Sequence, residues 1–351
     1  MNKDIISYIN NYIDNFKPYK NGRWCYEDGI LMTAIYDLYK VTKNQKYYDF
    51  VYNFYDNHIE DDGTIKNYKV DEYNIDNICS GNALIDLYLD AKLSKFRTAI
   101  DTLCSQLRLH PITKEGSFWH KQIYPHQVWM DGIYMGLVFY AKYAKYFGDG
   151  EDILDIKHQL NNLINRLYDN DRHLFTHAYD EARLMQWADK ETGKSPNVWS
   201  RACGWVAMAM VDIYEVLELN EAKVVLDLLV NGLSKYLDEG MLYQVVDKVF
   251  FNGNYLETSG SAMLAYAILK AKRIKMADYN DLGNKIFNTI LEKKFDGNHL
   301  NGICRVAGLD NARRNGSIEY YMSEDVVADE VKGVAPFIMA YSELEAKDGN
   351  Q

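Results

Sequence analysis

Apolar side chains recur every three or four residues over most of this chain, and that spacing predicts α-helices. The pattern gives twelve of them, near 3–16, 26–42, 46–58, 76–92, 95–108, 128–147, 150–168, 202–218, 221–237, 259–274, 278–295 and 333–346. Two kinds alternate: 204–214 is apolar on nearly every side, whereas 150–168 carries one apolar stripe and one charged face. Helices of the first kind should be buried beneath helices of the second kind. We therefore predict a closed double ring whose six inner helices run parallel.

Strand-like alternation is scarce in this sequence. Only 241–251 and 172–177 are candidates for short β-hairpins, so a parallel sheet with crossover helices is not expected. Four of the five prolines lie between helical stretches, and no Gly-, Ser- or Pro-rich linker divides the chain. With 48% hydrophobic residues, the chain can bury a large core. We predict one all-α domain over residues 1–351.

Charge and cysteine usage limit the possible partners. The 39 Lys and Arg against 50 Asp and Glu give a net charge of −11, so no basic field is available for nucleic acid. The five cysteines contain no Cys-x-x-Cys pair and are expected to be reduced and buried. Residues 1–16 lack the apolar core of a signal peptide, and no stretch is long enough to span a bilayer. We expect a cytoplasmic monomer or homodimer with no membrane or nucleic-acid partner.

The tryptophans gather at the expected starts of the inner helices and in two long connections, 110–127 and 169–199. They are Trp24, Trp119, Trp129, Trp187, Trp199 and Trp205. Parallel inner helices bring their N-termini to one face, and each start also carries acidic or aromatic side chains. Aromatic rings stack on sugars, carboxylates serve as general acid and base, and helix N-termini favour anions. This combination indicates a small anionic carbohydrate as the ligand.

Two aspartates stand out among these helix starts. A carboxylate at a helix N-terminus is most often a cap. Asp131, however, lies between a methionine and a glycine at the head of an apolar run, where an idle charge would be costly. Asp76 shows the same pattern more weakly.

The start of the helix expected at 202–218 combines an arginine with two tryptophans. Trp205 alone would be interpreted as a core residue. Together, Trp199, Arg201 and Trp205 favour a binding site, because a buried arginine needs an anionic partner.

Other chemistries find little support in the sequence. His173 and His177 are four residues apart with Asp180 downstream, but no Glu follows the first histidine and the stretch is loop-like. The chain has no phosphate loop, dinucleotide fingerprint or Gly-x-Ser-x-Gly elbow. We expect neither a metal nor a cofactor.

Longer blocks of sequence surround the residues named above. They are YNID at 73–76, GSFWHKQIYPHQVWMDGIYM at 116–135, THAYDEARLMQWADKETGKSPNVWSRACGWVAMAM at 176–210, YLETSGSAMLAYAI at 255–268 and the C-terminal YYMSEDVVADEVKGVAPFIMAYSELE. In this order they resemble glycoside hydrolase family 105, the unsaturated rhamnogalacturonyl hydrolases, which are related to the unsaturated glucuronyl hydrolases of family 88. The resemblance implies an (α/α)6 barrel, a toroid of six helical hairpins, here with short β-hairpin insertions.

The resemblance also implies an activity. The substrate would be a short oligosaccharide that ends in a 4,5-unsaturated uronic acid, as left by a polysaccharide lyase. The enzyme would hydrate the C4=C5 bond, with Asp131 as general acid and base and Asp76 as the second carboxylate. Arg201 would hold the substrate carboxylate. The same match assigns the remaining substrate contacts to His120, His177, Trp199, Trp205, Trp129 and Trp24.

Four other functions remain open at this point. An unsaturated glucuronyl hydrolase could act on different lyase products. An inverting glycosidase could use Asp76 and Asp131 as base and acid on an intact glycoside. A sugar epimerase could use His120 and His177 across the ring, and a carbohydrate-binding protein would show affinity without turnover.

Overall fold

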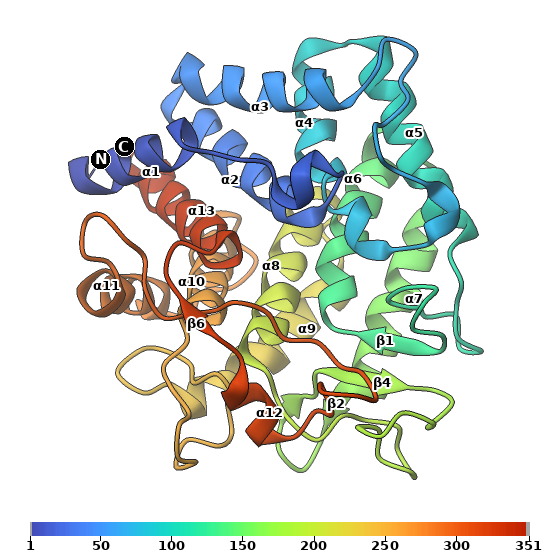
Figure 1. Ribbon diagram of the computed structural model, residues 1–351, viewed down its shortest axis with the longest axis vertical. Coiled ribbons are helices and arrows are strands. Elements are labelled where there is room, and N and C mark those ends of the chain that lie inside the picture. The colour runs from blue at the N-terminus through green and yellow to red at the C-terminus, as the bar shows by residue number, and fades with distance from the viewer. Residues whose placement is uncertain (1, 349–351) are drawn as a thin grey trace.

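The computed structural model describes residues 2–348, and within them six helical segments form an inner ring (Figure 1). They are α2 (Tyr26–Thr42), α4 (Gly81–Ala91), a π-helical turn (Ile133–Leu137) continued by α6 (Val138–Tyr146), α8 (Ser200–Leu217), α10 (Thr258–Arg273) and α13 (Val331–Asp348). Neighbours in this order touch one another, and α13 closes the ring against α2.

Six further helices cover the inner ring. They are α1 (Lys3–Asp14), α3 (Gln45–His58), α5 (Ser94–Leu109), α7 (Gly150–Leu167), α9 (Asn220–Leu233) and α11 (Leu282–Lys294). Each of α3, α5, α7, α9 and α11 packs on the inner helix that precedes it in the chain. The first and last helices meet, because the Asn2 backbone N–H donates to the Tyr341 hydroxyl at 2.9 Å.

Burial follows the two kinds of helix that the sequence predicts. Every residue of α8 from Ser200 to Ile213 is buried, and so is every residue of α10 from Thr258 to Ala271. The outer helix α7 instead buries mainly one stripe, which includes Ile156, Leu160, Leu163 and Leu167.

Three predicted helices begin later than expected, and one of them, predicted over 278–295, is α11, which begins at Leu282. The segment predicted as 128–147 opens with strand β1 (Gln127–Trp129) and continues into the π-helical turn. The segment predicted as 76–92 opens with a 3-10 turn, Ile75–Ile78, ahead of α4. Apolar spacing cannot separate these tighter or wider turns from an α-helix, and π-helical turns are frequent at functional sites.

The strands are short and pair in three hairpin-like units. Strand β1 pairs antiparallel with β4 (Ala178–Asp180), β2 (Tyr168–Asp169) with β3 (Leu174–Phe175), and β5 (Ile303–Cys304) with β6 (Val326–Val327). The hairpin expected around 172–177 is therefore present as β2 and β3. The one expected at 241–251 is not a regular hairpin, because its residues make only isolated bridges, such as Tyr243 with Leu256. The short helix α12 (Ile318–Ser323) was not predicted.

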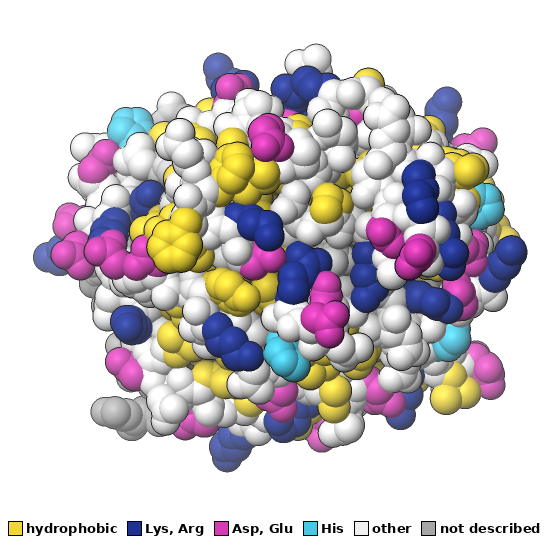
Figure 2. Space-filling model, turned by 90° about the horizontal axis from the view of Figure 1, so that it is seen from below, with side chains coloured by type: hydrophobic (Ala, Val, Ile, Leu, Met, Phe, Trp, Pro, Cys, Tyr) yellow, Lys and Arg dark blue, Asp and Glu magenta, His cyan; other side chains and the backbone are white. Residues whose placement is uncertain are grey.

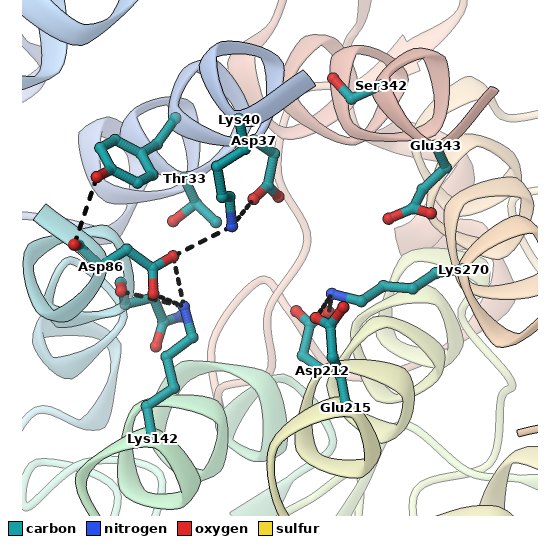
Figure 3. A network of polar contacts seen from close by, with 12 residues as sticks. Thr33, Asp37, Lys40, Asp86, Lys142, Asp212, Glu215, Lys270, Ser342 and Glu343 are labelled. Carbon is teal, nitrogen blue, oxygen red and sulfur yellow. Dashed lines mark hydrogen bonds and ion pairs between the residues drawn. The ribbon is translucent and has the colours of Figure 1, made fainter. Parts of the chain in front are cut away.

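The C-terminal halves of the inner helices line a cavity of about 820 Å³ at one end of the barrel. Paired charges surround it (Figure 3): Lys142 lies 2.9 Å from Asp86, and Lys270 lies 2.8 Å from Asp212 and 2.7 Å from Glu215. These lysines neutralise the carboxylates and the partial negative charge of the helix C-termini. The carboxylates of Asp86, Asp212 and Glu215 are thus paired within the protein.

Candidate active site

The predicted site residues lie at the opposite end, where the inner helices begin. Asp76 belongs to the 3-10 turn before α4, Asp131 lies immediately before the π-helical turn, and Arg201 is in the first turn of α8. His120 interacts electrostatically with both Asp76 and Asp131. Figure 2 views the molecule from below Figure 1, the side on which α12, β2 and β4 lie, and shows acidic, basic and hydrophobic side chains interspersed there.

Asp76 is held by two basic side chains. Its Oδ2 lies 2.6 Å from Lys121 Nζ, and its Oδ1 lies 3.5 Å from His120 Nε2. Burial by itself would raise the pKa of Asp76, but the charge of Lys121 outweighs it, with a further contribution from His120 when that ring is protonated, and the pKa is lowered. Asp76 is therefore ionised at neutral pH.

Asp131 has different surroundings. Its Oδ2 is buried and lies 3.2 Å from Nε2 of His177, while 14% of the side chain remains exposed. The pairing of β1 with β4 sets Trp129 opposite Ala178, and the backbone N–H of Met130 donates to the carbonyl of His177 at 3.0 Å. Strand pairing thus places the aspartate beside the histidine, and no lysine or arginine of residues 2–348 forms an ion pair with it.

Three rings stack to form one wall of the site. Trp129 stacks with His120, with ring centroids 4.4 Å apart, and with Tyr124, 5.1 Å apart, each pair within 9° of parallel, and the centroids of His120 and Tyr124 are 6.5 Å apart. Burial lowers the pKa of His120 to about 4, so this imidazole is neutral at neutral pH. The wall offers flat apolar faces next to both aspartates.

Arg201 is buried and already has an anionic neighbour within the protein. Its Nε donates to Ser259 Oγ at 2.7 Å, its Nη2 donates to the Cys304 carbonyl, and Glu257 lies 3.8 Å away. Glu257 is fully buried and also accepts from the Gly260 backbone N–H at 2.7 Å as the N-cap of α10. The Nη1 atom of Arg201 is buried and has no hydrogen-bond partner among the described residues.

The remaining predicted aromatic residues divide into two groups. The Trp199 ring lies 4.8 Å from His177, and Trp205 contacts Tyr26 edge-on at 6.3 Å, so both adjoin the site. Trp24 packs instead on Tyr55 and donates to the Asn77 carbonyl at 2.8 Å, and like Trp199 and Trp205 it is 1% exposed. Its role as a substrate contact stays a prediction.

Sequence reasoning missed several residues of this site. They are Tyr26, Lys121, Tyr124, Glu257 and Tyr321. Most lie inside the sequence blocks that carry the family resemblance, but only their contacts with distant residues show what they touch. The Tyr321 hydroxyl, for example, lies 2.7 Å from Nδ1 of His177, 144 positions earlier.

Within the part of the chain that the structure describes, no group of three or more His, Cys, Asp or Glu side chains is arranged to hold a metal ion. None of the helices in residues 2–348 is long and apolar enough to cross a membrane.

A ring of paired helices that gathers carboxylates and aromatic rings at one end is the architecture expected of an (α/α)6-barrel glycoside hydrolase. The model of Glycosyl Hydrolase Family 88 matches residues 1–347, and the chain belongs to this family. It is 40% identical to a family 105 glycoside hydrolase from C. acetobutylicum ATCC 824, with a TM-score of 0.92 and 98% of each chain covered. The predicted fold, family resemblance and enzyme class are thereby confirmed, and the non-catalytic binding protein and the epimerase are set aside.

More distant relatives have related descriptions. The unsaturated rhamnogalacturonyl hydrolase YesR of Bacillus subtilis (strain 168) is 22% identical over 271 residues, which cover 72% of each chain. The unsaturated glucuronyl hydrolase of Bacillus sp. GL1 is 14% identical with a TM-score of 0.68, covering 94% of this chain and 88% of the other. The second likeness shows the shared fold alone.

Proposed function

We propose that this enzyme removes a 4,5-unsaturated uronic acid from short oligosaccharides by hydrating its C4=C5 bond, with Asp131 as general acid and base. The substrate class that we favour is the unsaturated galacturonyl-rhamnose unit left by a rhamnogalacturonan lyase. The family membership and the description of the YesR relative support this choice.

The observation that carries the proposal is the unequal setting of the two aspartates. Lys121, whose Nζ lies 2.6 Å from Asp76 Oδ2, keeps Asp76 ionised. Asp131 instead contacts His177 and has no lysine or arginine partner in the described chain. One site thus offers a carboxylate that is held by a cation and a second carboxyl group with no cationic side chain of Lys or Arg beside it. Acid–base chemistry by two carboxyl groups requires this kind of difference.

The proposed reaction proceeds in three steps. The electron pair of the C4=C5 bond takes the proton of Asp131 at C4, and the positive charge that develops at C5 is shared with the ring oxygen. Asp76 stabilises this charge as a nearby anion. Water then adds at C5 while the Asp131 carboxylate accepts its proton. The resulting hemiketal opens, and the neighbouring sugar departs with the aldehyde at C1 left behind.

The proposed uronate subsite lies between the ring wall and Arg201. The rings of Trp129 and Trp199 both contact the ring of His177. In Arg201, Nη1 is the nitrogen that has no hydrogen-bond partner among the described residues. A buried arginine does need an anion, but Glu257 meets that need. The substrate carboxylate would therefore be the second anion beside the Arg201 guanidinium, after Glu257, and would accept a hydrogen bond from Nη1.

The polysaccharide, the cellular location, the oligomeric state and the domain organisation of the enzyme are further parts of the proposal. Rhamnogalacturonan is a pectic polysaccharide, so the activity would belong to pectin degradation, on small fragments inside the cytoplasm and by a monomer or homodimer. We also propose that residues 1–351 form one catalytic domain, because one apolar core includes residues from Ile5 to Tyr341.

A panel of lyase-generated disaccharides tests the proposal. Loss of the alkene ultraviolet absorbance, fastest for the rhamnose-linked substrate, is the expected result. Faster loss with glucuronate-containing or glycosaminoglycan fragments would reassign the substrate. Turnover of saturated glycosides at a comparable rate would instead favour a conventional inverting glycosidase.

A further inference from the structure

Tyr321 reaches the centre of the site from the short helix α12. Its hydroxyl lies 2.7 Å from Nδ1 of His177, and the other ring nitrogen, Nε2, lies 3.2 Å from Asp131 Oδ2. Tyr321 and His177 are both fully buried. The three groups form a chain that begins at a residue remote in sequence and ends at the proposed general acid.

We propose that Tyr321 is a positioning residue that fixes the tautomer of His177, so that an Nε2–H always faces Asp131. This inference rests on the function proposed above. It assigns a role to a residue of α12 that never has to touch the substrate.

The proton positions follow from the donors and acceptors present. A neutral imidazole carries one proton, on Nδ1 or on Nε2, and the partner of one nitrogen decides where it resides. Burial raises the pKa of the Tyr321 hydroxyl well above 10.0, so this group keeps its proton and donates to Nδ1. The imidazole proton is then on Nε2, the atom that faces the carboxylate.

The opposite arrangement is unfavourable in this geometry. A proton on Nδ1 would leave the lone pair of Nε2 directed at an oxygen of Asp131 within 3.2 Å. Neither Nε2 of His177 nor Oδ2 of Asp131 has another hydrogen-bond partner among the described residues. The contact is electrostatic rather than a well-aligned hydrogen bond, and catalytic hydrogen bonds commonly tighten in the substrate complex.

The contacts from Tyr321 through His177 to Asp131 give the two carboxylate oxygens of Asp131 different surroundings. Because Oδ2 is buried and faces the Nε2–H of His177, the proton that Asp131 delivers is placed on Oδ1. After delivery, the same Nε2–H stabilises the carboxylate that remains. Tyr321 thus acts in the transition state rather than in substrate binding, and its loss should lower kcat more than it changes KM.

The structure provides a variant that removes only this hydroxyl. Tyr321→Phe keeps the ring contacts with Tyr320, at 5.0 Å, and Trp199, at 6.4 Å. The matched control is Tyr320→Phe, since Tyr320 is also buried in α12 but its hydroxyl accepts from the Gly308 backbone N–H at 2.8 Å. Ser317 caps the helix in both variants.

The decisive measurement is ¹⁵N NMR of the His177 ring, identified by its loss in His177→Gln, together with kcat and KM on the unsaturated disaccharide. The signals of the wild-type ring should place its proton on Nε2 alone, and Tyr321→Phe should give a mixture of tautomers. We expect kcat to fall roughly tenfold in Tyr321→Phe, with KM within about twofold. Tyr320→Phe should change neither the ring signals nor kcat beyond about twofold.

Three results would overturn the proposal. They are a wild-type His177 with its proton on Nδ1 or on both nitrogens, an unchanged ring tautomer in Tyr321→Phe, and equal losses of kcat in the two tyrosine variants. The wild-type ring signals decide the first point even if Tyr321→Phe does not fold. They also need no turnover, so they test the tautomer independently of the proposed reaction.

Discussion

Lys121 Nζ lies 2.6 Å from Asp76 Oδ2, in a mouth where only 11% of the Asp76 side chain is exposed. Lys121→Met removes this cation and leaves the carboxylate to be stabilised by a neutral His120. We expect the free energy of unfolding to fall by about 3 kcal/mol, because breaking one side of a buried ion pair leaves an uncompensated charge. Urea unfolding at pH 7 measures the change. Lys66→Met, which removes an exposed partner of Glu60, should cost less than about 1 kcal/mol.

The same variant should respond differently to acid. The pKa of Asp76 is lowered from 3.8 in the folded protein, so its contribution to stability is present above that value and is lost as the pH falls through the folded pKa. Lys121→Met removes this contribution and leaves burial to raise the pKa. The difference in unfolding free energy between wild type and variant should therefore narrow as the pH falls, first through the raised pKa of Asp76 in the variant and then, below about 4, through its lowered pKa in wild type. A constant difference from pH 7 to pH 3 would show that Lys121 does not hold the charge of Asp76.

Asp131→Asn should abolish consumption of the conjugated alkene while leaving the fold intact. Asparagine fills the same volume beside His177 but neither delivers a proton to C4 nor accepts one from water. General acid–base groups contribute about 10²- to 10⁴-fold, so a loss of this size in kcat is expected. The absorbance assay measures it, and circular dichroism checks the fold. Asp155→Asn, on the outer helix α7, should retain wild-type turnover.

Periodicity was sufficient to predict the double ring because helices buried on every side, such as α8 and α10, are mostly apolar around their whole circumference, whereas an outer helix has one apolar stripe. It also predicted that parallel inner helices bring Asp76, Asp131 and Arg201 to one end of the barrel, and the structure places them at the starts of inner helices there. Periodicity could not predict which other residues contact the residues of the site. Glu257 adjoins Arg201 from 56 positions away, and Tyr321 reaches His177 from α12, a helix too short to show an apolar period.

Arg201→Lys tests how the substrate carboxylate is held. Lysine keeps a positive charge beside Glu257 but cannot reproduce the planar fork that binds Ser259 and the Cys304 carbonyl while presenting Nη1. We expect kcat/KM for the unsaturated uronate to fall roughly 10- to 100-fold, the value of one charge-assisted hydrogen bond. The methyl ester of the same disaccharide, which carries no negative charge, should lose much less. Equal losses on both substrates would show that Arg201 serves the protein's own structure alone.

The substitution Lys270→Met tests whether the charged cavity at the other end of the barrel has only a structural role. Its ammonium group lies 2.8 Å from Asp212 and 2.7 Å from Glu215, and burial raises the pKa of Asp212 even with this lysine present. Lys270→Met leaves Asp212 buried beside Tyr266 without its cation. The unfolding free energy should fall by about 3–5 kcal/mol at pH 7, and kcat/KM at a temperature where the variant is folded should stay within about twofold of wild type. The double variant Lys270→Met with Asp212→Asn should recover part of the stability, because it removes the unpaired charge. A large loss of kcat/KM in the folded single variant would instead mean that this end of the barrel is coupled to the reaction.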